Sequence, residues 1–339
     1  MIRARTFLFA CACLASVLAL SACGNKKDSL SAPSAKSFPV MLDFFPNADH
    51  AALYTALAHQ DFRAVGLDVK LEAPADPSEP LKLLASGRVE LAISYEPELL
   101  LARDRGLKLV AIGALVQRPL TSIIALPGKH ISKVSDLAGK RVGTAGIPYQ
   151  AAYLKTALEA ANVNPSSVSE ANVGFNLIPA MTSGQVDATL GGFWNYEGIQ
   201  LQLKHKHPVV IPIDQAGVPT YNELIVVARE DEARHAGQDL RAFMQALTRG
   251  QREVRADPAA ATRLLLAANP SLEKKLQLES IKQTLPASVP RESGRPYGWQ
   301  SPKAWAAFSR WMLIHHLLKH DPGLGLPPFT NEFLPGQGI

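Results

Sequence analysis

Apolar and polar positions along the chain follow two alternating periods. Runs in which every second residue is apolar, such as 67–71, indicate strands, whereas apolar residues three or four positions apart, as in 51–65, indicate helices. Strands are expected at 38–43, 67–71, 90–94 and 108–113, with helices at 51–65, 81–85 and 96–104. This order predicts βαβ units, in which helices connect parallel strands of an α/β domain.

The alternation continues to residue 228, and the pattern then becomes helical. Further strands are expected at 140–143, 186–190, 209–213 and 221–228, with helices at 150–161 and 197–204. Four helices follow at 232–255, 258–268, 272–284 and 302–319. Two α/β lobes followed by a helical C-terminal part are therefore expected.

The chain is expected to pass between the lobes twice, near 124–128 and near 218–223. The first lobe would then consist of 38–125 and 222–339, and the second lobe of 126–221. Two crossings allow a hinge with a ligand cleft between the lobes, as in periplasmic binding proteins. The C-terminal ends of the strands are expected to line that cleft.

The N-terminus has the features of a bacterial secretory signal. Arg3 and Arg5 precede an uncharged apolar run at 7–20, which is shorter than the about 20 residues of a membrane-spanning helix. Small residues directly before Cys23 resemble a lipobox, in which the cysteine is diacylated; a plain signal peptide is the alternative. We expect a signal peptide at 1–22, lipidation of Cys23 and a flexible tether at 23–37. The protein would then be anchored on the periplasmic side of a bacterial membrane.

Composition excludes several classes of function. The three cysteines are Cys11, Cys13 and Cys23, so the mature body has no thiol for a disulfide, a Cys-zinc site or nucleophilic catalysis. The formal charge of +5 falls to +3 without Arg3 and Arg5, and no basic run with interleaved aromatics suggests nucleic acid. Neither a Gly-x-Ser-x-Gly nor a His-Glu-x-x-His motif occurs. We expect no enzyme, no metal site and no cofactor.

Polar and aromatic residues follow two of the expected strands in the first lobe. After the first strand come Asp43, Phe44, Asn47 and His50. These residues could face a ligand, or Asn47 could cap the next helix while Phe44 packs in the core. Tyr95 and Glu96 follow the third strand, and a helix-start role explains the acid equally well.

Three further segments are candidates in or near the second lobe. Gly146 and Tyr149 belong to a glycine-containing loop at 143–149, which offers backbone N–H groups and an aromatic ring. Trp194, Asn195 and Glu197 follow a glycine pair and suit a flat heterocycle with polar edges, although a core and helix-start role is the alternative. Tyr221 and Glu223, at the second crossing, could close on a ligand or belong to the hinge.

Four segments carry a family resemblance. They are Leu-Asp-Phe-Phe-Pro-Asn-x-x-His at 42–50, Ala-Gly-Ile-Pro at 145–148, Gly-Gly-Phe-Trp-Asn-Tyr-Glu-Gly at 191–198 and Phe-Thr-Asn-Glu-Phe-Leu-Pro at 329–335. The chain resembles the thiamine-precursor-binding (ThiY) group of ABC importers, which is related to yeast-type thiamine pyrimidine synthases. The resemblance implies a two-lobed type II periplasmic-binding-protein fold.

The resemblance also implies a ligand and partners. The ligand would be an aminopyrimidine, either formylaminopyrimidine or hydroxymethylpyrimidine, with Trp194, Tyr149 and Phe44 stacking on the ring. Glu197 or Asp43 would accept from its amino group. An ABC permease and its ATPase would be the protein partners of a monomer that touches the membrane only through its lipid.

The sequence leaves several alternatives to this function open. Riboflavin, a sulfonate such as taurine, or an aromatic acid would fit the same scaffold. A sensor subunit is a further possibility. A pyrimidine-synthase-like enzyme or a hydrolase is disfavoured because the mature chain lacks cysteine. The yeast-type pyrimidine synthases that the chain resembles need a cluster of cysteines.

Overall fold

The computed structural model describes residues 35–322 and 326–337. The expected signal peptide, Cys23 and most of the tether lie outside the described residues. The tether prediction extends too far by two residues, because Lys36 and Ser37 already belong to strand β1 (Lys36–Met41) and align with Leu67 and Asp68 of the neighbouring strand.

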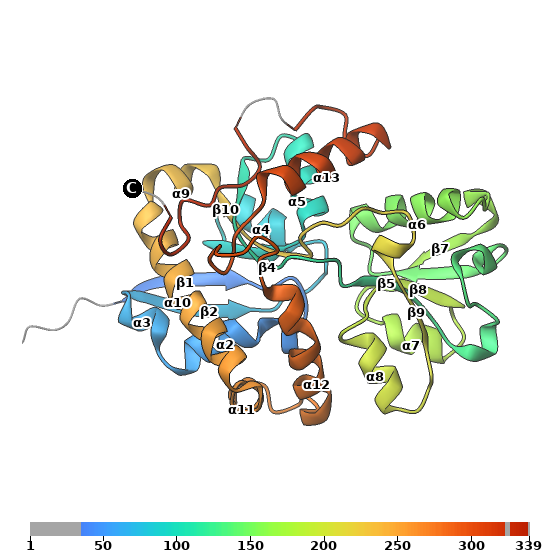
Figure 1. Cartoon of the computed structure of the whole chain (residues 1–339), viewed down its shortest axis with the longest axis horizontal. Helices are drawn as coiled ribbons and strands as arrows, with labels where there is room; N and C mark the ends of the chain where they lie inside the picture. The colour runs from blue at the N-terminus through green and yellow to red at the C-terminus, as the bar shows by residue number, and fades with distance from the viewer. Residues whose placement is uncertain (1–34, 323–325, 338–339) are drawn as a thin grey trace, which may run out of the picture. The chain divides into compact units, whose positions relative to one another are not determined.

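The first sheet has five strands in the order β2-β1-β3-β10-β4, of which β1, β2, β4 and β10 are labelled in Figure 1. Its remaining strands are β2 (Leu67–Glu72), β3 (Leu91–Ser94), β4 (Leu109–Val116) and β10 (Leu224–Arg229). β1 runs parallel to β2 and β3, whereas β10 runs antiparallel to β3 and β4. β10 therefore brings the chain back into the first sheet from a distant part of the sequence.

The second sheet repeats this plan with the order β7-β6-β8-β5-β9. Its strands are β5 (Thr121–Ala125), β6 (Arg141–Thr144), β7 (Ser169–Asn172), β8 (Ala188–Phe193) and β9 (Val209–Pro212). β6 is parallel to β7 and β8, and β5 is antiparallel to β8 and β9. Each sheet thus contains one antiparallel strand, β10 or β5, which is adjacent in sequence to a crossing.

The first crossing lies earlier than the sequence pattern indicated. Residues 121–125, expected at the end of the first lobe, form β5 and pair with β8 and β9 of the second sheet. The chain therefore leaves the first sheet at 117–120. Both β4 and β5 are completely buried, and apolar residues predominate in each, so hydrophobicity alone does not reveal which sheet each strand joins. The second crossing, at 216–223, agrees with the expected position.

Helices cover both sheets. They are α2 (Ala51–Ala58), α3 (Asp61–Ala64), α4 (Pro80–Ala85), α5 (Glu96–Asp104), α6 (Pro148–Ala160), α7 (Leu177–Thr182), α8 (Glu197–Leu203), α9 (Glu230–His235), α10 (Gly237–Ala256), α11 (Pro258–Ala268), α12 (Lys274–Thr284) and α13 (Pro302–Ile314). The helix expected at 51–65 is broken because Gln60 adopts a left-handed conformation with φ 59°. The helix expected at 302–319 ends at Ile314.

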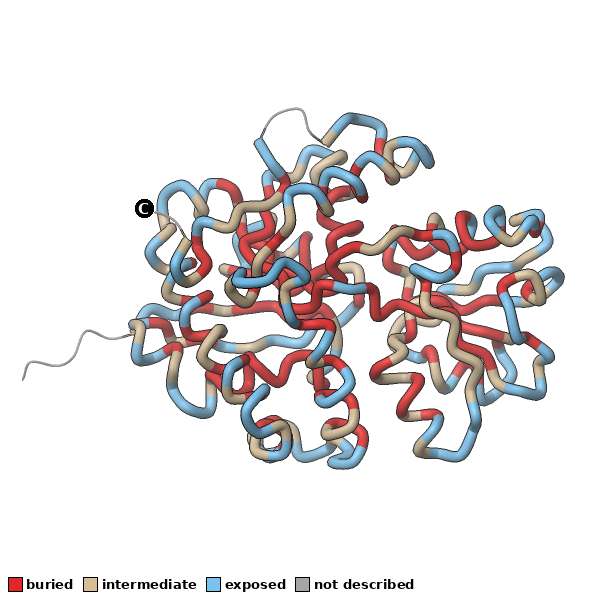
Figure 2. The backbone as a smooth tube through the Cα atoms, in the orientation of Figure 1, coloured by how far each residue is buried: buried red, intermediate tan, exposed pale blue. Residues whose placement is uncertain are grey.

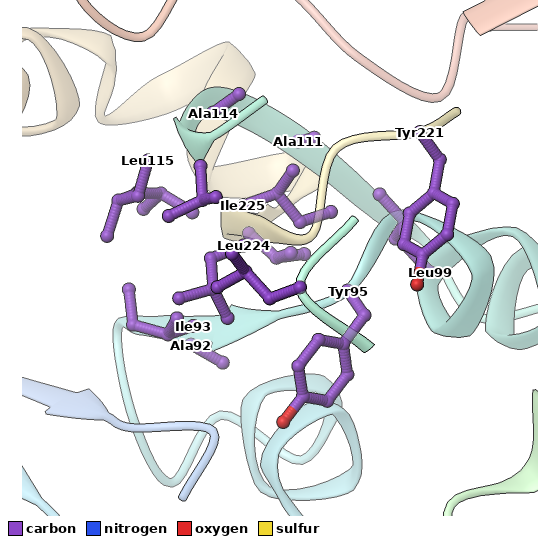
Figure 3. Packing of buried hydrophobic residues seen from close by; sticks show 14 of the residues in the cluster. Ala92, Ile93, Tyr95, Leu99, Ala111, Ala114, Leu115, Tyr221, Leu224 and Ile225 are labelled. Carbon is purple, nitrogen blue, oxygen red and sulfur yellow. The ribbon is translucent and has the colours of Figure 1, made fainter. Parts of the chain in front are cut away.

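The core of the first sheet is built around β10 and β4. Figure 3 shows Leu224 and Ile225 of β10 among apolar residues of β3 and β4, and all of these are buried (Figure 2). Helix α10 packs closely on α2, and at Gly250 an added Cβ would collide with the backbone carbonyl of Ala52. Within 35–322 and 326–337, no helix is both long and apolar enough to cross a membrane.

Candidate functional site

A narrow chamber lies where loops from both sheets meet. Its walls are formed by Asp43, Phe44, Asn47, Tyr95, Ala145, Ile147, Tyr149, Gln150, Leu177, Gly191, Phe193, Tyr196 and Glu197. Most of these residues lie directly after strands β1, β3, β6 and β8 or at the end of β8 itself, where an α/β fold places its ligands. The chamber therefore matches the expected cleft in position.

Hydrogen bonds from His50 and Tyr95 hold the carboxylate of Asp43 in place. Nδ1 of His50 accepts from the backbone N–H of Asn47 at 3.2 Å, so Nε2 carries the ring proton. That Nε2 donates to Oδ1 of Asp43 at 2.8 Å, and the Tyr95 hydroxyl donates to Oδ2 at 2.8 Å. His50 does not line the chamber; its role is to hold Asp43 in place.

Glu197 is the second acid of the chamber. Burial raises its pKa to about 7, although the backbone N–H of Phe193, which donates to Oε2 at 2.7 Å, opposes that rise. Near neutral pH a substantial fraction of this carboxyl is therefore protonated. A protonated carboxyl offers both an O–H donor and a carbonyl acceptor on one edge.

Tyrosine and glutamine side chains complete the polar lining. Tyr95 and Tyr149 meet edge to face with ring centroids 5.7 Å apart, and burial raises the pKa of both hydroxyls well above the ordinary value. Gln150 accepts from the backbone N–H of Ala145 at 2.9 Å through Oε1. This bond orients the amide, and among the described residues Nε2 has no recorded acceptor, so it is available as a donor.

Gly191 is required for the close approach between β8 and Gln150. Its φ is 110°, a backbone conformation that residues other than glycine rarely adopt. A Cβ built on Gly191 would overlap Nε2 of Gln150. Both the strain and the overlap explain why a glycine stands at the end of this strand beside the chamber.

A larger outer chamber of about 480 Å³ adjoins the narrow one. The two share Phe44, Asn47, Leu177, Tyr196 and Glu197. Phe175, from the loop between β7 and α7, contacts Phe44 with ring centroids 4.6 Å apart and Phe45 with centroids 4.1 Å apart. These aromatic contacts join the two sides of the molecule at the rim.

The narrow chamber itself is almost closed. Its free volume of about 20 Å³ accommodates little more than one water molecule. A six-membered ring requires more space than this. Ligand entry therefore requires the two sides to separate or the lining side chains to move.

Polar contacts also connect the two sides behind the chamber. Asn195, in the loop before α8, donates from Nδ2 to Oδ1 of Asp49 at 2.7 Å and to Oγ1 of Thr284 at 2.6 Å. Gln277 of α12 donates to the Tyr196 hydroxyl at 3.1 Å. Asn195 is thus brought near the site without lining it, since its amide serves the contact between the two sides.

The other candidates occupy different positions. Trp194 lines neither chamber, because its indole N–H donates to the carbonyl of Pro119 at 3.0 Å. Asn47 lines both chambers, but its Oδ1 accepts from Asp49 N–H and its Nδ2 donates to Phe45 O, so its amide caps the 3-10 helix η1 (Ala48–His50). Gly146 has a φ of 77° in the loop but is not part of the lining.

Tyr221 and Glu223 lie at the second crossing, whereas Glu96 begins helix α5 and bonds to that crossing. Glu96 accepts from the backbone and side-chain N–H groups of Asn222, both at 2.7 Å. Glu223 accepts from the N–H groups of Leu120 and Thr121 and from the Tyr221 hydroxyl at 3.0 Å. Glu223 thereby ties the two crossings together, and Glu96 ties α5 to the second one. This supports the hinge alternative for Tyr221 and Glu223.

Sequence reasoning missed several lining residues. Gln150, Phe193 and Tyr196 line the narrow chamber, and Phe175 lines the outer one. Tyr196 lies beside Glu197 in the segment 191–198, which carries part of the family resemblance. Gln150 resembles any polar position of helix α6, so no pattern in one sequence distinguishes it. Within the described ranges no group of three or more His, Cys, Asp and Glu side chains is arranged to hold a metal.

Several known proteins are similar to this chain. A formylaminopyrimidine-binding protein of Halalkalibacterium halodurans is 34% identical over 313 residues, covering 90% of this chain and 93% of the relative. A putative thiamine biosynthesis protein of Haemophilus influenzae is 35% identical over 256 residues, covering 75% and 81%. The alkanesulfonate-binding protein of Xanthomonas axonopodis superposes with a TM-score of 0.66 at 16% identity, covering 84% of this chain and 95% of that one.

The structural similarity identifies the fold, which is the two-lobed periplasmic-binding-protein architecture expected from the sequence. A family model described as "NMT1/THI5 like" matches residues 47–261, which include every lining residue of the narrow chamber except Asp43 and Phe44. With that match and the two relatives above 30% identity, the chain belongs to the NMT1/THI5-like family.

Proposed function

We propose that this protein is the extracytoplasmic solute-binding component of an ABC importer and that it captures an aminopyrimidine precursor of thiamine. Formylaminopyrimidine and hydroxymethylpyrimidine are the two candidate ligands. One observation carries the proposal: a narrow chamber between two sheets combines aromatic walls with the buried carboxyl of Glu197. The 34% identical formylaminopyrimidine-binding protein supports the same ligand class.

The polar lining complements the edge of a 4-aminopyrimidine. Such an edge has an amino group that donates and a ring nitrogen that accepts. The protonated carboxyl of Glu197 can donate to the ring nitrogen and accept from the amino group. The Nε2 group of Gln150 can donate to the second ring nitrogen or to a carbonyl of the substituent, and Asp43 can accept a further N–H or O–H.

The aromatic side chains match the flat ring. Tyr95, Tyr149, Phe193 and Tyr196 lie around the narrow chamber and offer faces and edges for stacking. In this proposal they replace Trp194, whose indole is engaged with Pro119. The outer chamber provides room for a substituent that projects from the ring.

Binding would proceed by opening and closing about the two crossings. The narrow chamber supports an open form for entry, because its present free volume is smaller than the ligand. Contacts between the two sides, such as the Asn195–Asp49 hydrogen bond, would re-form when the ligand is enclosed. The closed form would then deliver the ligand to the permease. We propose binding without catalysis, since the body of the chain has no cysteine for synthase-type chemistry.

We also propose that Cys23 is diacylated and holds the protein on the periplasmic side of the membrane. The support is the sequence Leu20-Ser21-Ala22-Cys23 after a short apolar run. Mass spectrometry of the membrane-extracted protein is expected to find a new N-terminus at Cys23 carrying two or more acyl chains. A soluble mature form cleaved elsewhere would contradict this part of the proposal.

Two acids in the chamber argue against a sulfonate ligand. Asp43 would repel a sulfonate, as would the ionised fraction of Glu197, and the lining of the narrow chamber contains neither arginine nor lysine. The similarity to an alkanesulfonate-binding protein therefore applies to the fold alone.

Calorimetric titration of the full chain in mild detergent tests the ligand class. Formylaminopyrimidine and hydroxymethylpyrimidine would be compared with thiamine, riboflavin and taurine under one buffer condition. We expect at least one of the two pyrimidines to bind at least tenfold more tightly than riboflavin or taurine. Tighter binding of riboflavin or taurine, with no response to either pyrimidine, would overturn the proposed ligand.

A further inference from the structure

A separate cavity of about 310 Å³ lies where both crossings meet the segment that leads into α13. We call it the hinge pocket and define it by Gln117, Tyr221, Arg291, Trp299, Lys303 and Ala304. It shares no lining residue with the narrow chamber. The hinge pocket is therefore a separate site from the pyrimidine site described above.

Cationic groups dominate one wall of the hinge pocket. Arg291 donates to Oγ1 of Thr220 at 2.6 Å, and its pKa is lowered by burial and by the nearby charge of Arg118. Lys303 has no recorded ion pair within the described part of the chain. The one acid in the lining, Glu292, already accepts from Trp299 Nε1 at 3.1 Å and from Arg295 Nε at 3.4 Å.

The N-terminus of α13 opens onto the same wall. The N–H of Trp305 donates to Ser301 O at 3.0 Å, and Pro302 has no N–H. The preceding N–H groups of Lys303 and Ala304 have no recorded acceptor in the described ranges, and Ser301 makes no side-chain cap. Free N–H groups at a helix N-terminus, together with its dipole, favour an anion.

A buried amide provides an independent sign of a missing partner. Gln117 is only 8% exposed, and its backbone N–H donates to Ala287 O at 2.8 Å. Its Nε2 is fully buried and has no hydrogen-bond partner among the described residues. A buried donor without an acceptor costs about 1–3 kcal/mol, so an acceptor group on a ligand would remove that penalty.

The remaining lining combines aromatic and apolar side chains with the polar residues Thr220, Asn222 and Ser301. Tyr221 is buried, and the Trp299 ring lies partly buried beneath the guanidinium of Arg295 at 4.0 Å. A ligand that fills this pocket needs an apolar body as well as an acceptor group. Both features can be provided by a small molecule of about ten heavy atoms.

We infer that the hinge pocket binds a small organic anion, with its carboxylate or phosphate on Gln117, Arg291 and the free N–H groups of α13 and its planar body against Trp299 and Tyr221. The pocket contains residues of both crossings, Gln117 of the first and Tyr221 of the second. An anion that fits the closed hinge better than the open one would therefore strengthen pyrimidine binding, and the pyrimidine would strengthen anion binding by the same factor.

Three probe molecules test this inference on the full chain in detergent. Benzoate carries a carboxylate, phenyl phosphate carries a phosphate, and benzamide is the neutral counterpart of benzoate. We expect benzoate or phenyl phosphate to bind at least tenfold more tightly than benzamide. Amide NMR signals of Lys303, Ala304 and the Gln117 side chain should shift upon binding. Equal binding of benzamide, or shifts confined to other residues, would overturn the inference.

Variants separate the hinge pocket from the pyrimidine site. Arg291→Met and Lys303→Met are expected to weaken anion binding at least fivefold each, because each removes one cation from the wall of the pocket. Lys155→Met, on the exposed side of α6, is the matched control and should change nothing. Without the anion, all three variants should bind the pyrimidine within twofold of the unmodified protein. Unchanged anion binding in Arg291→Met and Lys303→Met would contradict the assignment, whatever the pyrimidine result.

Discussion

Asn195 donates a hydrogen bond to Asp49 across the two sides of the molecule, with 2.7 Å between Nδ2 and Oδ1. The donor lies in the loop between β8 of the second sheet and helix α8. The acceptor lies in η1, which follows β1 of the first sheet. Thr284 joins the same contact through Oγ1, which is 2.6 Å from Asn195 Nδ2 and 3.0 Å from Asp49 Oδ1. This buried contact can form only when the two sides are together, so it should favour the closed form.

Replacing Asn195 tests its effect on closure. Asn195→Ala is expected to weaken pyrimidine binding about 5- to 30-fold, because one or two buried hydrogen bonds are worth about 1–2 kcal/mol. The loss should appear mainly as faster dissociation, since Asn195 does not line the chamber. Stopped-flow measurement of the dissociation rate checks this. Gln202→Ala, on the exposed side of α8, is the control; an unchanged rate in Asn195→Ala would contradict a role in closure.

Removing the carboxyl of Glu197 tests the pyrimidine contact directly. Glu197→Ala is expected to weaken binding at least tenfold, which corresponds to about 1.4 kcal/mol, while thermal unfolding stays close to that of the unmodified protein. Unchanged affinity measured by calorimetry would leave Glu197 with only a helix-start role.

The pH dependence of binding gives a separate test of Glu197. Burial raises its pKa to about 7, so the protonated form that complements a neutral aminopyrimidine is lost as the pH rises through 7. Affinity should therefore decrease between pH 6 and 8.5. Glu197→Gln keeps a donor and an acceptor without titrating, so its affinity should stay nearly constant over that range. A decrease of equal size in Glu197→Gln would assign the pH effect to another group.

Gly191 provides a steric test of the narrow chamber. Gly191→Ala should weaken pyrimidine binding at least tenfold, because the new Cβ overlaps Gln150 Nε2 and a φ of 110° strains any other residue. Gly174→Ala is a useful comparison, since Gly174 also has a positive φ but has no atom within 4 Å of an added Cβ. If both variants bind the pyrimidine equally well, the chamber beside Gly191 is not the binding site.

The sequence predicted most elements of the fold, since strand and helix periods are local properties. Helices α5 and α11 match their predicted residues completely. The assignment of β5 to the second sheet depended on pairing with β8 and β9, which are distant in sequence. Hydrophobic periodicity contains no information about such partners, so the first crossing was misplaced by a few residues.

The lining of the candidate site was predictable where a polar or aromatic residue followed the end of a strand. Asp43, Tyr95, Tyr149 and Glu197 line the narrow chamber, as a reading of strand C-termini would suggest. Trp194 met the same criterion but turns to Pro119, because consecutive residues of a loop point in different directions. Gln150 was missed since its role depends on Ala145 and Gly191, and such orientation appears only in three dimensions.

Glu96 should make the stability of the protein depend on pH. Burial raises its pKa from 4.5 to about 8, so the folded state retains a proton that the unfolded chain releases at lower pH. Its contribution to stability is complete below about pH 4.5 and is lost as the pH rises through 8. The melting temperature should therefore fall between pH 5 and pH 9 through this group.

Glu96→Gln isolates this effect because the amide keeps an acceptor for Asn222 and carries no charge to bury. At pH 9 the variant should exceed the unmodified protein by at least about 1 kcal/mol, or about 2 °C in melting temperature, whereas at pH 5 the two should be similar. Differential scanning fluorimetry across this range measures the difference, with Glu159→Gln on the exposed surface of α6 as the control. Parallel melting curves for Glu96→Gln and the unmodified protein at every pH would show that Glu96 does not retain its proton in the folded state.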